Sequence, residues 1–210
     1  MAKIKSGILG PLSGKLGPII GSTWKGIPCV KEVSKKPKRE SSPAQLASRK
    51  KLKFINNYLV PFHQYLTVGF ANDAPQRTEI SAAISRNYHD AFPWENDEIK
   101  VELAKFRISI GSLRMVSDFY ATASEQVVNF SWKENYGKGA KFNDQLMIVL
   151  YSPEGEIADG CTGGPSRAHK EWQLKYDSEL AGKLVHVFVS VTSVNRKLIA
   201  DSMYFGTLQL

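Results

Sequence analysis

The second half of the chain alternates between short apolar segments and turn-like segments. In residues 184–191 (LVHVFVSV) valine occupies every second position, which is the period-2 pattern of a β-strand. Similar β-branched or aromatic segments are FRISIGSL (106–113), VVNFSW (127–132), QLMIVLY (145–151), HKEWQLKY (169–176) and SMYFGTLQL (202–210). Such spacing predicts an antiparallel β-sandwich of immunoglobulin-like or fibronectin-like type over residues 101–210, with Trp132 as a core aromatic.

Residues 43–100 show helical periodicity instead and form a small helical section. Ser42 and Gln45 flank Pro43 in an S-x-x-Q capping box with proline at the first helical position. The helix is expected to end before Pro61. Its expected buried stripe consists of Leu52, Ile55, Tyr58 and Leu59.

A second helix is predicted over residues 76–88. Its apolar residues recur at helical spacing and form one stripe. They are Ile80, Ala83, Ile84 and Tyr88. The intervening TVGFAND (67–73) resembles a short connector. The fold class is therefore mainly β, with two short helices between an N-terminal segment and the sandwich.

The N-terminal segment reads neither as a helix nor as an ordinary strand. In GPLSGKLGPIIGSTWKG (10–26), prolines remove backbone donors and glycines permit unusual backbone angles. Residues 1–42 are therefore expected to form an extended, basic, Gly/Pro-rich arm and hinge. The apolar side chains that could dock this arm are Leu16, Ile19, Ile20, Trp24 and Ile27.

The positive charge of the chain is concentrated in its first third. Residues 1–70 hold 13 Lys and Arg against two acids, a net charge of +11, whereas the other 140 residues have a net charge of −3. Candidate contacts to an anionic partner are Lys35, Lys36, Lys38, Arg39, Arg49, Lys50 and Lys53. Four readings stay open: nucleic-acid phosphates, a membrane face, an acidic surface of another subunit, or a solvated lysine-rich face.

No catalytic constellation stands out in the sequence. The four histidines have no spacing that indicates a metal site, and Cys161 in GCTGG lacks a partner signature, so it is read as a flexible loop thiol. NYGKG (135–139) lacks the context of a phosphate-binding loop and is expected to be a hairpin loop. We therefore expect no enzyme, no cofactor, no metal and no small-molecule substrate.

Cellular targeting is only weakly indicated. No run approaches the roughly 18 apolar residues of a membrane span, and the apolar stretch near the N-terminus is too short for a convincing signal peptide. A cytoplasmic or particle-associated location is favoured. Cys29 and Cys161 are expected to be free thiols.

Several motifs resemble those of an uncharacterised family. These are GKxG at 14–17, SxWKGI at 22–27, SPAQ at 42–45, FxW at 130–132 and DSxY at 201–204. The chain is similar in these motifs, and in length, to a domain-of-unknown-function family found mainly in Bacteroidota. The resemblance implies a bacterial or bacteriophage origin and supplies no catalytic residues. Cys29-Val30-Lys31 departs from it, because an aromatic residue and Arg would be expected there.

Three functions are compatible with these features. The first is a structural protein that associates with copies of itself or docks on a larger particle through its arm, although the arm could equally fold back on its own chain. The second is a nucleic-acid-binding or packaging module. The third is a carbohydrate-binding module in which Trp172 or Tyr136 stacks on a sugar.

Overall fold

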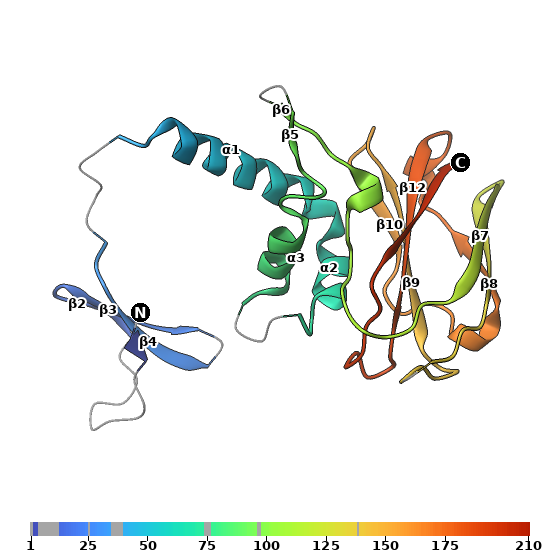
Figure 1. The fold of residues 1–210 in the computed structure, drawn as a ribbon, viewed down its shortest axis with the longest axis horizontal. Helices are drawn as coiled ribbons and strands as arrows, with labels where there is room; N and C mark the ends of the chain where they lie inside the picture. Colours follow the sequence, from blue (N-terminus) through green and yellow to red (C-terminus); the bar gives the residue numbers. More distant parts are fainter. Residues whose placement is uncertain are drawn as a thin grey trace. The chain divides into compact units, whose positions relative to one another are not determined.

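The computed structural model describes residues 2–3, 13–24, 26–34, 40–73, 77–95, 98–137 and 139–210. The chain divides into two compact units, Met1–Leu46 and Ala47–Leu210. Across the described residues the protein is mainly β, with antiparallel sheets and short helices, which confirms the predicted fold class (Figure 1).

The N-terminal segment forms a small antiparallel sheet. Its strands are β1 (Ala2–Lys3), β2 (Gly14–Leu16), β3 (Ile19–Trp24) and β4 (Ile27–Glu32), in the order β1-β4-β3-β2. Two-residue loops join β2 to β3 and β3 to β4, and Gly17 and Gly26 occupy them with φ values of 57° and 77°. The segment is extended as expected, but Gly17 and Gly26 lie in tight turns, so the residues on either side of them form paired strands.

Helix α1 (Pro43–Tyr58) begins at the predicted capping box. The Ser42 N–H donates to Gln45 Oε1 at 3.2 Å, and the Gln45 N–H donates to Ser42 Oγ at 3.3 Å. The predicted buried stripe is partly wrong, because Leu52 is exposed whereas Lys51 is buried beside Ile55. The Lys51 ammonium lies 4.2 Å from the centroid of the Tyr88 ring, a cation–π contact that favours its burial.

Two further helices follow α1 in the described chain. Helix α2 (His63–Gly69), which was not expected, follows the 3₁₀ turn η1 (Val60–Phe62). It includes the first three residues of the expected connector (67–73), and the other four form turns. Helix α3 (Glu79–Asn87) is capped by Thr78, whose Oγ1 accepts a hydrogen bond from the Ser81 N–H at 3.2 Å. Its predicted stripe is confirmed, while residues 74–76 lie outside the described residues.

The remaining described residues form the predicted sandwich. Its strands are β7 (Ser117–Ser124), β8 (Val127–Lys133), β9 (Gln145–Ser152), β10 (Ile157–Cys161), β11 (Glu171–Lys175), β12 (Leu184–Thr192) and β13 (Met203–Gln209). One sheet has the order β11-β8-β7 and the other β10-β9-β12-β13. Apolar residues from both sheets share one core, which includes Trp132. Two packed antiparallel sheets around one core are the architecture that immunoglobulin-like and fibronectin-like sandwiches share.

Some of the individual strand predictions were wrong. FRISIGSL (106–113) is not a regular strand, and within it only Ser112 and Leu113 form isolated bridges, both to Ala200. Strands β7 and β10 were missed. The NYGKG loop joins β8 to β9, which lie in different sheets, so it is not the expected hairpin loop.

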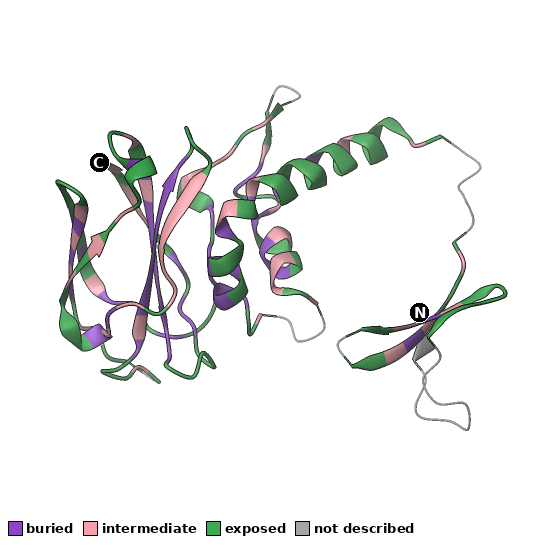
Figure 2. Cartoon of the chain, turned by 180° about the vertical axis from the view of Figure 1, so that it is seen from behind, coloured by how far each residue is buried: buried purple, intermediate pink, exposed green. Residues whose placement is uncertain are grey.

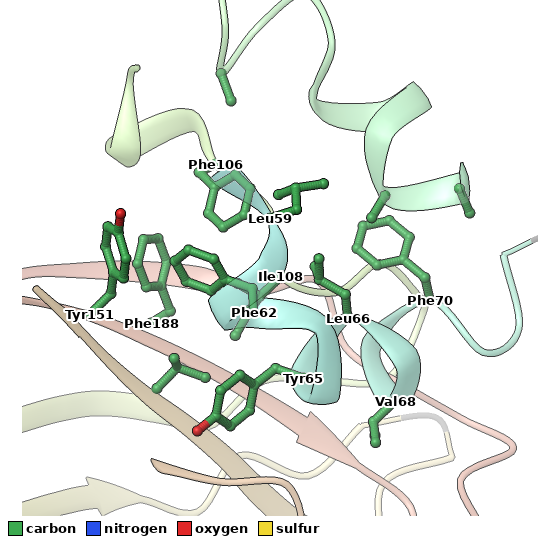
Figure 3. Packing of buried hydrophobic residues seen from close by; sticks show 14 of the residues in the cluster. Leu59, Phe62, Tyr65, Leu66, Val68, Phe70, Phe106, Ile108, Tyr151 and Phe188 are labelled. Carbon is green, nitrogen blue, oxygen red and sulfur yellow. The ribbon is translucent and has the colours of Figure 1, made fainter. Parts of the chain in front are cut away.

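Helices cover the other face of the β9–β12 sheet. Phe62, from η1, and Phe106, from the segment before β7, pack their rings against the sheet, with centroid distances of 4.6 Å for Phe62–Tyr151 and 5.7 Å for Phe106–Phe188 (Figure 3). Strands β9 and β12 are therefore buried on both faces. The short elements of this unit are β5 (Trp94–Glu95), β6 (Glu98–Ile99), η2 (Leu103–Lys105), η3 (Arg167–His169) and η4 (Ser178–Leu180).

Candidate docking surfaces

The N-terminal sheet divides the predicted docking residues between its two faces. Trp24 pairs directly with Ile27, and Leu16 pairs with Ile19. Directly opposed residues share a face, and successive residues of a strand alternate between faces. Ile20 therefore lies on the face of Trp24 and Ile27, whereas Leu16 and Ile19 lie on the opposite face.

These apolar side chains are largely exposed. Leu16, Ile19, Trp24 and Ile27 have exposed fractions between 36% and 64%, and Ile20 is half-buried. Figure 2 shows how little of β2, β3 and β4 is buried. Cys29, in contrast, is a buried apolar residue as expected. A sheet of this size has too few residues to build a core that covers both of its faces.

One side of α1 presents a basic surface. Arg49, Lys50 and Lys53 are exposed, and their spacing at about 100° per residue places them opposite the buried Lys51 and Ile55. No acidic residue occurs in α1. The other predicted anion contacts, Lys35, Lys36, Lys38 and Arg39, lie outside the described residues.

The aromatic residues considered as sugar platforms differ in their surroundings. Trp172 opposes the buried Phe130 across β11 and β8, and the two rings stack at 6.2 Å. Trp172 is therefore half-buried and packs against the sandwich core. Tyr136, in the loop between β8 and β9, is exposed.

Two of the four histidines, His169 and His186, have side-chain hydrogen-bond partners. His186 Nδ1 lies 2.9 Å from the Tyr204 hydroxyl, and burial lowers the pKa of this imidazole. His169 Nδ1 lies 2.6 Å from Ser166 Oγ and accepts the Ser166 N–H at 3.1 Å, which closes a capping box on η3. The Ser166–His169 contact is thus a local cap of the 3₁₀ turn.

The Cys161 thiol does not lie in a flexible loop, as expected from its sequence, because it ends strand β10 opposite Ile148. Burial raises its pKa to about 11, so little thiolate exists at neutral pH. Cys29 and Cys161 are both free, as expected. Within the described ranges, no three His, Cys, Asp or Glu side chains are placed to share a metal ion.

A buried ion pair inside the sandwich was missed in the sequence. Arg167 and Asp144 have side chains that are 0% and 1% exposed, and Arg167 Nη2 lies 3.3 Å from Asp144 Oδ2. The guanidinium also donates to the carbonyls of Asn135 at 2.9 Å and Arg114 at 2.6 Å. The pair thus ties together three loops at one end of the sandwich.

Comparison with known protein families assigns the chain to one of them. Residues 11–206 match DUF6266, a family of unknown function. The chain belongs to the DUF6266 family. The match begins just before β2 and ends within β13, so DUF6266 includes both the N-terminal sheet and the sandwich. A search among curated proteins finds no match. Among the helices of the described chain, none is both long and apolar enough to span a membrane.

Proposed function

We propose that this DUF6266 protein is a non-enzymatic assembly protein whose N-terminal sheet docks on a second copy of the chain. The observation that supports this proposal is the exposure of apolar residues on both faces of a very small sheet. Exposed apolar surface of this kind is typical of interaction sites. Its burial against another subunit supplies the stabilisation that the sheet lacks alone.

The edges of the sheet favour the same interpretation. Among the described strands, β1 and β2 each pair with one neighbour, so each leaves a row of backbone groups on its outer side. Such edges accept an additional strand from another chain. An arm exchanged between identical subunits satisfies both the backbone groups and the apolar side chains.

Charge complementarity favours a second copy as the partner. Residues 1–70 carry a net charge of +11, whereas the rest of the chain carries an excess of acids, with a net charge of −3. In the sandwich, Glu154, Glu156, Asp177 and Glu179 are exposed. The Asp177 N–H donates to Asp159 Oδ2 at 2.8 Å, which connects the β10 segment to the segment after β11. Opposite charges of this kind orient subunits before contact.

The setting of this assembly is proposed to be a bacterial or phage-like particle. The resemblance of the sequence motifs to a family found mainly in Bacteroidota supports such a source. In a particle, many copies meet at high local concentration, so weak docking of each arm adds up through multivalency.

Deletion of residues 1–33 tests the proposal. We expect the shortened chain to stay folded, because Ala47–Leu210 contains its own two cores, and to lose the higher-order association of the full chain. Sedimentation velocity over a concentration series measures the mass of the assemblies that each chain forms. The double substitution Trp24→Ser/Ile27→Ser should reduce association equally, whereas Tyr136→Ser, an exposed aromatic on the sandwich, should not. Identical masses for the full and shortened chains would contradict the proposal.

Nucleic-acid binding is the second candidate, because Arg49, Lys50 and Lys53 share one exposed face of α1. Three phosphate contacts predict that log K falls with log salt with a slope of about −2.7 on duplex DNA. Fluorescence anisotropy with a labelled duplex measures this slope, and the variant with all three residues changed to Gln should abolish it. Association of the chain with itself, without affinity for DNA, favours assembly instead.

A further inference from the structure

The outer face of the three-stranded sheet carries a regular array of polar side chains, of which only Glu171 is charged among the two rows described below. The register places Tyr120, Ser131 and Glu171 in one row across β7, β8 and β11. The next row consists of Thr122, Asn129 and Gln173. The residues between these positions, such as Phe130, face the sandwich core. Because successive residues of a strand point to opposite faces, the sheet has a buried apolar face and an outer face that bears hydroxyl and amide groups.

A shallow depression of about 260 Å³ lies in this outer face. Tyr120 forms part of its wall and is 63% exposed. The other polar residues that line it are Thr122, Asn129, Ser131, Glu171 and Gln173. Its volume is below the range of pockets for drug-sized ligands, so it suits one small ring or one residue of a longer chain.

The chemistry of the depression selects a neutral, hydroxyl-rich ligand. Hydroxyl and amide side chains both donate and accept hydrogen bonds, as sugar hydroxyls do. The Asn129 amide donates through Nδ2 to Ser124 Oγ at 3.0 Å, which orients its carbonyl oxygen. An exposed aromatic ring offers a flat apolar face for the C–H groups of a pyranose.

Other ligand classes fit this face less well. In the described structure none of the residues lining the depression is Lys or Arg, and Glu171 is acidic, which disfavours phosphate, sulfate or uronate groups. An apolar protein segment would leave the amide and hydroxyl groups without hydrogen-bond partners, at a substantial cost in free energy.

We propose that this face binds a neutral pyranose unit of a glycan, with Tyr120 stacking on the ring and Gln173, Asn129 and Glu171 bonding to its hydroxyls. The site is built by the sandwich alone and does not depend on the docking of the N-terminal sheet. It would give the protein a contact to a carbohydrate surface in addition to its contacts with other copies.

Isothermal titration calorimetry of the full chain tests this site. The neutral probes are maltohexaose, cellohexaose, xylohexaose and mannohexaose, and a high-mannose N-glycan distinguishes a glycoprotein source from a free polysaccharide. A hyaluronan hexasaccharide serves as the anionic probe. We expect at least one neutral probe to bind at millimolar concentration or below, and Tyr120→Ala to weaken it about tenfold or more. Gln173→Ala should also weaken it.

Tyr136→Ala provides the matched control, since it removes an exposed tyrosine elsewhere on the sandwich, and circular dichroism verifies that each variant is folded. The control is expected to bind like the unmodified chain. The absence of binding by every neutral probe, binding by hyaluronan alone, or equal losses in Tyr120→Ala and Tyr136→Ala would each overturn the proposal.

Discussion

Replacing Arg167 with methionine should destabilise the protein strongly. The guanidinium is fully buried and reaches three acceptors: Asp144 Oδ2 and the carbonyls of Asn135 and Arg114. Methionine fills a similar space but makes none of these hydrogen bonds. The Asp144 carboxylate then stays buried without its cation, although it still accepts the Lys141 N–H at 2.7 Å.

The size of this effect follows from the burial of the pair. Removing one partner of a buried ion pair typically costs about 3–5 kcal/mol, because the remaining charge is uncompensated. For a chain of this length, 1 kcal/mol corresponds to a shift in Tm of about 2–4 °C. Arg167→Met should therefore lower the Tm by roughly 6–20 °C. Adding Asp144→Asn should recover part of this loss, since it removes the orphaned charge.

Urea unfolding and thermal melting of the unmodified chain, Arg167→Met, Asp144→Asn and the double variant give the coupling energy between the two side chains. The control is Lys133→Met, which removes an ion pair of 2.9 Å to Asp118 that is exposed on the surface. It should leave the unfolding midpoint nearly unchanged, because exposed pairs contribute little. If Arg167→Met shifts the midpoint no more than this control, or if the double variant shows no recovery, the argument from burial is refuted.

Three other positions give compact tests. Ser42→Ala should destabilise the first turn of α1 by about 1 kcal/mol, measured as faster amide exchange at Leu46, whose N–H donates to the Ser42 carbonyl. Gly69→Ala should cost about 1–3 kcal/mol in urea unfolding, because a Cβ there would lie 2.0 Å from the Ile108 carbonyl oxygen. Burial raises the pKa of Cys161 from 9.0 to about 11, so the folded chain holds the thiol proton more tightly than the unfolded chain does. Relative to Cys161→Ala, the free energy of unfolding should therefore be constant below pH 9.0 and fall as the pH rises towards 11. Rapid alkylation of the folded chain at neutral pH would contradict this.

The sequence predicted correctly the helix and the strand that are specified by neighbouring residues in the chain. The capping box at Ser42 and Gln45 forms as expected, and the valine alternation of residues 184–191 marks the central strand β12. Helix α2 was missed because its sequence, HQYLTVG, contains β-branched residues and no cap. Its helical form depends on burying Tyr65 and Leu66 against the rest of the core, which is a tertiary effect.

Long-range contacts explain the other differences. Arg167 and Asp144 lie 23 residues apart, and nothing in either local sequence marks them as a buried pair. Lys51 belongs to a basic run, yet it is buried because the ring of Tyr88, from beyond α3, covers its ammonium. The polar array around Tyr120 likewise depends on the register of three strands, which sequence periodicity alone does not determine.

The stability of the larger unit does not explain the apolar residues of the N-terminal sheet. The two cores of the larger unit consist of residues from Ile55 onward, so the sandwich and its helices form without apolar residues at positions 16–27. A sheet that served only as a tether would be more soluble with polar residues there, because exposed Leu16 and Trp24 promote non-specific association. Their presence on opposite faces is instead consistent with a sheet that is covered on both sides when docked, as an inserted arm would be. If only one face were covered on docking, apolar residues would be needed on that face alone. Because both faces carry them, Leu16→Ser and Trp24→Ser should each weaken assembly.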